Sequence, residues 1–316
     1  MRAERSQDAW SRSAAASALA LALVALTALT VVHAQRTETG TLSRLRDTGR
    51  IRLGYRTDAR PFSYTDESGK PAGYSIALCE RMLDGLRADA GASTLTPEWK
   101  PLVAAERFRA VQDHQIDLLC GADSETLERR TQVDFTTPVF PGGIGAVVRA
   151  DAPVRLREVL SGRGQTFRPT WRAAASQLLQ ARAFTAVTGT TAETWLNERL
   201  DELQIVAKVA LVPSYEDGLQ RLLARQSDVL FGERAILVDA ARRHRSAADL
   251  AMIDRLFTYE PLAFALGRDD EDFRLAVDRG LGRLYGSRQL ADVYVKWFGE
   301  LDESALAFFR WNTRSE

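Results

Sequence analysis

Histidine and cysteine are scarce in this sequence, and their scarcity excludes most kinds of catalytic and metal site. Three of the 316 residues are histidine and two are cysteine. Beyond the first 34 residues only His114 and His244 remain, too few for a His/Cys metal cage or a hydrolase triad of the usual kind. A Walker A loop is absent, and Gly142-Gly143-Ile144-Gly145 lacks the spacing of a dinucleotide-binding loop. We therefore expect neither a metal nor a cofactor.

An excess of charge of either sign is missing as well. The 42 Lys and Arg residues are matched by 42 Asp and Glu residues, so net charge gives no reason to expect a nucleic acid or an anionic membrane as partner. With 45% hydrophobic and 27% charged residues, the composition excludes disorder, collagen-like repeats and a disulfide-dense miniprotein. At roughly 100–200 residues per domain, the length suggests two domains or one large one. We expect a monomer that binds a small partner.

The first 34 residues have the pattern of a secretory signal peptide. Arg2, Arg5 and Arg12 precede an apolar run from Ala14 to Val32, which closes on the small residues of Val32-His33-Ala34. An uncleaved membrane anchor is the alternative, because about 19 apolar residues nearly span a bilayer. No cysteine lies near the cleavage site, which argues against a lipid anchor. We expect a mature chain of residues 35–316 in the periplasm, an oxidising compartment.

Short β-rich runs alternate with amphipathic segments along the rest of the chain. One helical face carries Ile76, Cys79, Met82 and Leu86 at three- to four-residue spacing. The pattern weakens between Pro153 and Ala183, where we predict a loop with a short helix. Strand-helix alternation predicts an α/β fold with mainly parallel sheets. The predicted strands are Ile51–Gly54, Ile116–Cys120, Ala146–Val148, Thr185–Thr188, Asp228–Phe231 and Leu262–Leu266, and the clearest helices are Ala105–His114, Ser214–Ala224, Asp272–Tyr285 and Gln289–Phe298.

Six strings of the sequence carry a resemblance to one family. They are GYRTDARPFSY (54–64), GYSI (73–76), IDLLCG (116–121), ERRTQVDF (128–135), GTT (189–191) and VYVKWFG (293–299). In type and order they resemble the periplasmic polar-amino-acid-binding proteins of ABC importers, solute-binding protein family 3. The glutamate/aspartate-binding branch is the most similar. Each string is weak alone, but together they span about residues 41–300.

The resemblance implies a type II periplasmic binding protein fold. In this fold two α/β lobes, joined by two crossover strands, close on one amino acid and pass it to an inner-membrane ABC permease. The glycine pair Gly142-Gly143, flanked by Pro138 and Pro141, indicates a joint. We therefore expect crossings near 139–143 and 257–260, with lobe I formed by residues 41–139 and 261–316 and lobe II by residues 144–256.

The resemblance assigns the ligand's α-carboxylate to Arg129. A planar guanidinium reads a carboxylate best, and in the family the arginine of a Glu-Arg pair has this role. The preceding residues 121–126 are expected to form a polar turn, where the N–H of Gly121 and the hydroxyl of Ser124 assist in binding. A solvated arginine on a short helix is the alternative for Arg129.

Two further arginines indicate the kind of side chain that is bound. Arg56 follows the first strand, and Arg107 lies in the first turn of the helix predicted over 105–114, where α/β sheets place ligand contacts. Arginine at both positions predicts an anionic ligand side chain, hence glutamate or aspartate. The alternative is that both arginines are salt-bridge partners of Asp58 or Glu106. Ala122 and Tyr215 weigh against an acidic ligand, since they stand where the acidic-ligand branch often has serine and histidine.

The second lobe is expected to complete the site. Thr190 and Thr191 end a strand and open a helix, so their hydroxyl and N–H groups can meet an anion at a helix N-terminus. Plain N-capping is the alternative. Glu233 matches the acid that pairs with the ligand's α-ammonium, although most relatives have Asp there. A helix first-turn acid favoured by the helix dipole is the alternative for Glu233.

The two cysteines are placed where they can pair. Cys79 lies on the inward face of the first helix and Cys120 at the end of a strand of the same lobe. The oxidising compartment permits a disulfide, which we predict. Two separately buried thiols are the alternative, because free cysteine is commonly buried.

Two other classes of function compete with a binding protein. Cyclohexadienyl (prephenate/arogenate) dehydratases resemble this fold and act on a carboxylated ligand in the cleft. Such an enzyme needs an acid/base pair, for which Glu233 is the one candidate in the sequence. A ligand-sensing domain of a signalling protein is the third class, but no second transmembrane segment or output domain follows. We expect a binding protein without catalysis.

Overall fold

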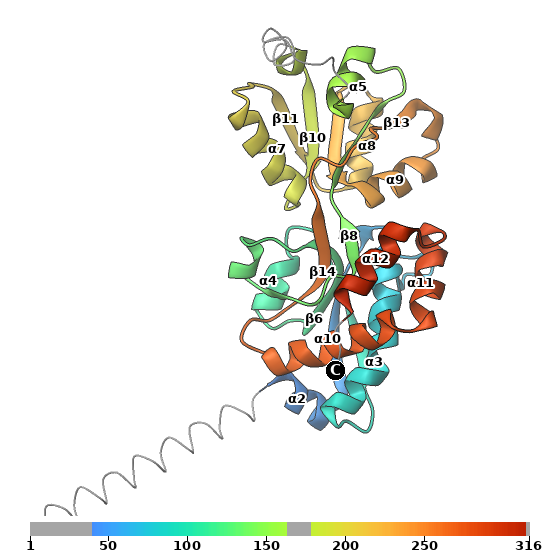
Figure 1. Cartoon of the computed structure of the whole chain (residues 1–316). Coiled ribbons are helices and arrows are strands. Elements are labelled where there is room, and N and C mark those ends of the chain that lie inside the picture. Colours follow the sequence, from blue (N-terminus) through green and yellow to red (C-terminus); the bar gives the residue numbers. More distant parts are fainter. Residues whose placement is uncertain (1–39, 163–177, 314–316) are drawn as a thin grey trace, which may run out of the picture.

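The chain folds into two lobes joined by extended strands (Figure 1). The structure, a computed structural model, describes residues 40–162 and 178–313. The predicted signal peptide lies outside the described residues, as does much of the segment for which we predicted a loop and a short helix. In the described part of the chain, no helix has both the length and the apolar character needed to cross a membrane.

Lobe I is built on a sheet in the order β5-β1-β6-β14-β7, with β8 added beside β14. Strand β1 runs parallel to β5 and β6, whereas β14 runs antiparallel to β6, β7 and β8. A small separate sheet, β2-β3-β4, was not predicted. The strands are β1 (Arg50–Arg56), β2 (Asp58–Ala59), β3 (Ser63–Thr65), β4 (Pro71–Ala72), β5 (Thr96–Leu102), β6 (Leu118–Ser124), β7 (Asp134–Phe135), β8 (Phe140–Gly142) and β14 (Glu260–Leu266).

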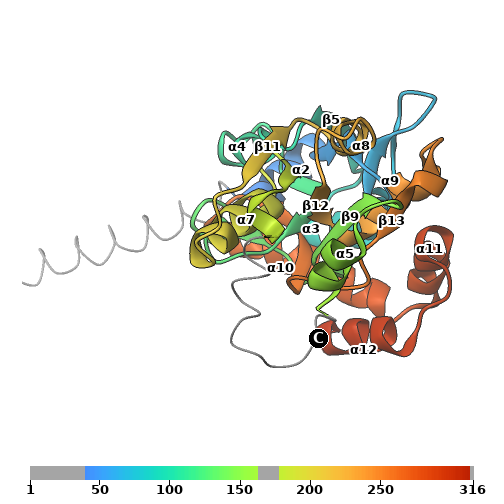
Figure 2. The ribbon, with the colours of Figure 1, turned by 90° about the horizontal axis from the view of Figure 1, so that it is seen from above.

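Helices cover both faces of the lobe I sheet. Helix α3 packs on β6 on one face, where α10, α11 and α2 pack against it in turn, and α4 packs on β1, β6 and β14 on the other. Seen from above, α11 and α12 lie to one side, beyond the helices of lobe II (Figure 2). The lobe I helices are α2 (Thr41–Thr48), α3 (Tyr74–Ala90), α4 (Arg107–Gln112), the 3₁₀ turn η1 (Arg129–Thr131), α10 (Glu271–Tyr285), α11 (Arg288–Phe298) and α12 (Glu303–Asn312).

Lobe II is built on a second sheet, in the order β11-β10-β12-β9-β13. The first three strands are parallel, and β9 runs antiparallel to β12 and β13. Helices α7 and α9 pack against this sheet from opposite sides (Figure 1). The elements are β9 (Ile144–Arg149), α5 (Val154–Ser161), β10 (Ala183–Val187), α7 (Thr191–Glu202), β11 (Lys208–Val212), α8 (Tyr215–Leu223), β12 (Val229–Glu233), α9 (Arg234–Arg243), η2 (Ala247–Asp249) and β13 (Leu250–Met252).

Strand periodicity explains why both faces of the sheets are covered. Along β9, Ile144, Ala146 and Val148 join one buried cluster, whereas Val147 joins the cluster on the opposite face. Successive side chains of a strand point to opposite faces, so a strand that is apolar at every position needs a helix layer on each side. The predicted α/β alternation is confirmed. Each main sheet is mixed, because the strands next to the crossings add antiparallel pairs to a parallel half.

The two connections between the lobes run side by side. One passes from β8 to β9 through Gly143, and the other from β13 to β14 through residues 253–259. A Cβ atom on Gly143 would lie 2.2 Å from the carbonyl oxygen of Thr258, so only glycine allows this approach. The Thr258 hydroxyl also accepts a hydrogen bond from the backbone N–H of Ile144 at 3.0 Å. The two strands therefore form one joint.

A disulfide ties the main helix of lobe I to the strand that leads into the cleft. Cys79 in α3 and Cys120 in β6 are bonded, with their Cα atoms 6.3 Å apart, and both side chains are fully buried. The predicted pairing is confirmed.

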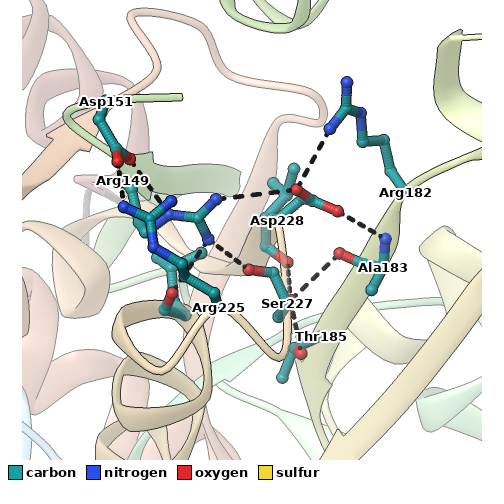
Figure 3. Close-up of polar contacts among 10 residues, drawn as sticks. Arg149, Asp151, Arg182, Ala183, Thr185, Arg225, Ser227 and Asp228 are labelled. Atoms are coloured by element: carbon teal, nitrogen blue, oxygen red, sulfur yellow. Dashed lines mark hydrogen bonds and ion pairs between the residues drawn. The ribbon is translucent and has the colours of Figure 1, made fainter. Parts of the chain in front are cut away.

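Polar contacts tie the strands of lobe II together at the end far from lobe I (Figure 3). Asp228 accepts a hydrogen bond from the backbone N–H of Ala183 at 2.9 Å and lies 3.5 Å from the guanidinium of Arg182. Arg149 donates to the carbonyl oxygen of Ser227 at 2.8 Å, and the Ser227 hydroxyl meets that of Thr185 at 2.9 Å. These contacts join the starts of β10 and β12 to the end of β9.

Candidate functional site

The facing ends of the two lobes bring together polar side chains from segments far apart in the sequence. In lobe I, β1 ends at Arg56 and β6 ends at Ser124, and in lobe II, β10 leads to Gly189 and β12 ends at Glu233. The carboxyl ends of parallel strands meet at one edge of a sheet, where α/β proteins bind their ligands. The region where these edges of the two lobes face each other, called the cleft below, is the candidate site.

Arg129 lies on η1 at the lobe I edge of the cleft. Its guanidinium donates to the carbonyl oxygen of Ser124 at 2.9 Å and, across the cleft, to that of Gly189 at 3.3 Å. The group also stacks over the ring of Phe108, 5.1 Å from its centroid. Burial and, next, the positive charge of Arg107 lower the pKa of Arg129 to about 10, while Asp123 opposes the change. Within residues 40–162 and 178–313, Arg129 forms no ion pair with a carboxylate at contact distance.

Arg107 is held by a carboxylate of the chain itself. Its Nε donates to Oδ1 of Asp123 at 2.5 Å, and one terminal nitrogen donates to the carbonyl oxygens of Ala104 and, at 3.1 Å across the cleft, of Gly189. Arg107 is 3% exposed. Burial lowers its pKa, and the positive Arg56 adds to this effect, whereas Asp123 raises the pKa. Arg107 therefore forms a salt bridge, as the alternative interpretation held, but its partner is Asp123 and not Glu106.

Asp123 is a residue of the site that the sequence analysis missed. We expected residues 121–126 to form a polar turn, but residues up to Ser124 continue β6 and pair with β14, with Ala263 opposite Asp123. The expectation of a turn is therefore wrong for Gly121 to Ser124, because pairing with a distant strand outweighs their weak local preference. The sequence signal that could have revealed the longer strand is the run of small residues that extends the predicted strand into the cleft.

Arg56 is likewise paired within lobe I. Its Nε and one terminal nitrogen donate to Oδ1 of Asp58 at 3.1 and 2.8 Å. Burial tends to lower the pKa of Arg56, but Asp58, Tyr215 and Asp123 together raise it above its ordinary value. The salt-bridge partner considered for Arg56, Asp58, is thus the one found in the structure.

Tyr215 approaches Arg56 from lobe II. It begins α8, is 3% exposed, and packs on Gly232, where a Cβ atom would lie 2.5 Å from the ring. Burial raises its pKa to about 12, and nearby Glu233 acts in the same direction, while Arg56 opposes the rise. The phenol is therefore neutral near pH 7, and it lies close enough to Arg56 for each group to affect the pKa of the other.

Thr190 and Thr191 stand at the start of α7, as predicted, but their hydroxyls have different partners. The Thr190 hydroxyl donates to the carbonyl oxygen of Val187 at 2.7 Å and does not cap the helix. The Thr191 hydroxyl donates to Glu260 at 2.6 Å and lies 3.4 Å from the hydroxyl of Ser124 in lobe I. Glu260, at the start of β14, is a second site residue that the sequence analysis missed.

Glu233 lies where β12 meets the joint between the lobes. Its two oxygens accept hydrogen bonds from the backbone N–H groups of Gly143 at 2.8 Å and Ala235 at 3.0 Å, the second of which caps α9. Burial raises the pKa of Glu233 to about 7, the two N–H groups oppose this rise, and Glu260 adds to it. Glu233 therefore caps a helix, as the alternative interpretation held, and its carboxyl also contacts the hinge.

Direct contacts across the cleft show that the lobes are closed. Gly189 and Thr191 of lobe II contact Arg107, Arg129 and Ser124 of lobe I, and at the rim Arg60 lies 3.4 Å from Asp239. A cluster of three or more potential metal ligands does not occur in the described parts of the chain. The site offers guanidinium, hydroxyl, carboxyl and backbone groups at the facing edges of the two lobes, an arrangement suited to holding a small zwitterion by hydrogen bonds.

Comparisons with known proteins agree with this geometry. Residues 51–300 match the family model of the bacterial extracellular solute-binding proteins, family 3. The L-glutamate/L-aspartate-binding protein of Pseudomonas aeruginosa is 24% identical over 261 residues, which cover 82% of this chain and 80% of the relative. An ABC transporter glutamine-binding protein of Bacillus subtilis is 23% identical over 261 residues, which cover 82% and 85%.

Solved structures give the same picture of the fold. An ancestral amino acid-binding protein, a precursor of cyclohexadienyl dehydratase, superposes with a TM-score of 0.65 at 21% identity, over 82% of this chain and 100% of the other. This likeness confirms the predicted two-lobed α/β fold of type II periplasmic binding proteins.

Proposed function

Because the chain belongs to the bacterial extracellular solute-binding proteins of family 3, we propose that it binds a free polar amino acid between its lobes. It acts in the periplasm and passes its ligand to an inner-membrane ABC permease. The observation that carries this proposal is Arg129, a guanidinium at the cleft that donates to carbonyl oxygens of both lobes and has no carboxylate partner among the residues that the structure describes. A ligand α-carboxylate supplies that partner when the lobes close over it.

The other groups of the cleft complete the binding of an amino acid backbone. The hydroxyls of Ser124 and Thr191 face each other across the cleft at 3.4 Å, so a ligand oxygen that enters between them is bound by both lobes. Glu233, which accepts a hydrogen bond from Gly143 of the hinge, receives the α-ammonium, which replaces one of its backbone hydrogen bonds. Binding is therefore coupled to closure, since the α-carboxylate of the ligand contacts Arg129 of lobe I and its α-ammonium contacts Glu233 of lobe II.

The first candidate ligand is an acidic amino acid, glutamate or aspartate. The glutamate/aspartate-binding relative supports it, as do the three arginines that converge on the cleft: Arg56, Arg107 and Arg129.

A carboxamide ligand, glutamine or asparagine, is the second candidate. Two of the three arginines already have a carboxylate of the chain as partner, Asp58 for Arg56 and Asp123 for Arg107. Within the described part of the chain, Arg129 then remains as the one guanidinium of the three without a carboxylate partner, available for one ligand carboxylate. The glutamine-binding relative is compatible with this ligand.

Calorimetric titration with the twenty amino acids tests the proposed function. We expect tight binding of at least one polar amino acid to the wild-type protein and loss of binding in the variant Arg129→Ala. Removing one partner of a buried charged pair costs about 2–5 kcal/mol. Arg130→Ala is the matched control, because Arg130 is exposed and pairs with Glu125 at 3.5 Å. Unchanged affinity in Arg129→Ala would contradict the assignment.

A dehydratase is the competing function on this fold. The raised pKa of Glu233, about 7, and the likeness to a dehydratase precursor support this alternative. Against it, both oxygens of Glu233 are engaged by backbone N–H groups. Incubation with prephenate and arogenate distinguishes the two functions, since a binding protein releases both unchanged.

A further inference from the structure

Asp123 places a carboxylate of the chain where the sequence analysis expected one from the ligand. It is 1% exposed and is the penultimate residue of β6, at the edge of the cleft. Its Oδ1 accepts the hydrogen bond from Arg107, and its negative charge also acts on Arg56 and Arg129, whose pKa values it raises. Asp123 is therefore the ion-pair partner of Arg107, and its charge is also felt by the other two arginines.

The second oxygen of Asp123 has no donor. Oδ2 is fully buried and forms no hydrogen bond with any described residue. A buried acceptor without a partner is costly, and more so when it carries charge. Gly121, on the same face of β6, makes room for it, because a Cβ atom there would lie 2.2 Å from Oδ2. The fold thus keeps space for a buried oxygen that can accept one more hydrogen bond.

The local balance of charge restricts what can satisfy this oxygen. Arg56 with Asp58 and Arg107 with Asp123 form two neutral pairs. A second ligand carboxylate would lie beside Asp123, where like charges repel, and a cationic side chain would meet Arg56 and Arg107. A neutral group that carries an N–H donor avoids both repulsions and supplies the missing hydrogen bond.

We propose that Asp123 is a specificity-determining residue that selects a neutral hydrogen-bond-donating side chain, such as the carboxamide of glutamine or asparagine, over a carboxylate. This inference rests on the proposed function, since it requires the α-carboxylate on Arg129. The carboxamide N–H donates to Oδ2 of Asp123. Specificity then has two sources. The buried negative charge of Asp123 repels the acidic isostere, and the new hydrogen bond favours the carboxamide.

The test compares two isosteric ligand pairs, glutamine with glutamate and asparagine with aspartate, by calorimetry on the mature protein. In the wild type, the preferred carboxamide should bind at least about tenfold more tightly than its acid. In Asp123→Asn, which keeps the shape and removes the charge, the ratio of the two dissociation constants should shift by about tenfold or more toward the acid.

Asp117→Asn is the matched control for loss of a buried ion pair. Asp117 lies just before the other end of β6, is 7% exposed, and pairs with Arg52 and Arg44. This variant should leave the ligand ratio unchanged. If Asp123→Asn does not fold, as judged by thermal unfolding, the double variant Arg107→Gln/Asp123→Asn removes both charges together and should shift the ratio in the same direction.

Two outcomes would overturn the inference. One is a wild-type protein that binds glutamate or aspartate more tightly than the matching carboxamide. The other is a ligand ratio that stays within twofold in the Asp123 variants while Arg129→Ala still abolishes binding. If no amino acid binds the wild type, the proposed function itself fails, a result distinct from either of these.

Discussion

Arg107 of lobe I donates a hydrogen bond to the carbonyl oxygen of Gly189 in lobe II, across 3.1 Å. Arg129 donates to the same oxygen at 3.3 Å. One backbone carbonyl of lobe II therefore receives two guanidinium groups of lobe I. Because both contacts exist only when the lobes are closed, the conformation of Gly189 bears directly on the closed state.

Gly189→Ala should weaken ligand binding by making closure less favourable. Gly189 has a φ of 75°, and a Cβ atom there would lie 3.3 Å from the Cα atom of Ala105 in lobe I. A left-handed conformation costs a residue with a Cβ about 1–2 kcal/mol in the open and closed states alike, whereas the contact across the cleft opposes only the closed state. We expect roughly a tenfold or greater loss of affinity by calorimetry. With ligand present, small-angle X-ray scattering should show a larger radius of gyration for Gly189→Ala than for the wild type.

Gly69→Ala separates these two effects. Gly69 has a φ of 79°, but no atom lies within 4 Å of a Cβ placed there. This variant carries the same backbone strain without a contact across the cleft, so affinity should be unchanged. If Gly189→Ala binds as tightly as the wild type, closure does not depend on this contact.

Ligand affinity should rise with pH through neutrality. The pKa of Glu233 is raised to about 7, chiefly by burial, so much of this carboxyl is protonated at pH 6 in the free protein. A ligand ammonium beside Glu233 favours the ionised form and lowers this pKa, so binding releases a proton. Affinity is therefore lower below pH 7 and reaches its full value above it. The expected difference between pH 6 and pH 8 is about tenfold.

Glu233→Gln tests the origin of this pH dependence. The variant should bind more weakly and with an affinity that no longer varies between pH 6 and pH 8. Glu216→Gln is the control, because Glu216 is an exposed acid of the same lobe. A pH profile that persists in Glu233→Gln would assign the proton to another group.

Removing the disulfide should destabilise the protein more than it affects binding. Cys79 and Cys120 are 41 residues apart, and closing a loop of that length in the unfolded chain corresponds to about 4 kcal/mol of stability in the chain-entropy model. We expect the double variant Cys79→Ala/Cys120→Ala to lose on the order of 3–4 kcal/mol of unfolding free energy in urea. Ligand affinity should stay within a few-fold. A loss below about 1 kcal/mol would contradict the entropic account.

Local patterns were sufficient to predict the α/β class and the disulfide. The helical spacing around Cys79 placed it on the buried face of α3, and the strand leading to Cys120 placed the second cysteine in the same lobe. Both inferences depend on periodicity over a few residues, which burial imposes wherever an element has a covered face.

Such local patterns could not predict the pairing of Arg107 with Asp123. The two residues are 16 positions apart, and their contact requires that β6 continue to Ser124, which pairing with β14 determines. Glu106 is adjacent to Arg107 in sequence but is exposed. The roles of all eight residues predicted to bind the ligand stay predictions: Arg56, Arg107, Gly121, Ser124, Arg129, Thr190, Thr191 and Glu233.

The polar contacts around Asp228, far from the cleft, bear on how lobe II moves. They join the starts of β10 and β12 to the end of β9 through Ala183, Ser227 and Arg149 (Figure 3). Strands fixed at their distal ends keep their mutual spacing at the proximal ends, where Thr191, Tyr215 and Glu233 lie. Opening should then be a rotation of lobe II as one rigid body about an axis through Gly143 and residues 253–259. The lobe II groups proposed to contact the ligand are consequently already in place before the ligand arrives, and amide exchange at β10 and β12 should be as slow in the open state as in the closed one.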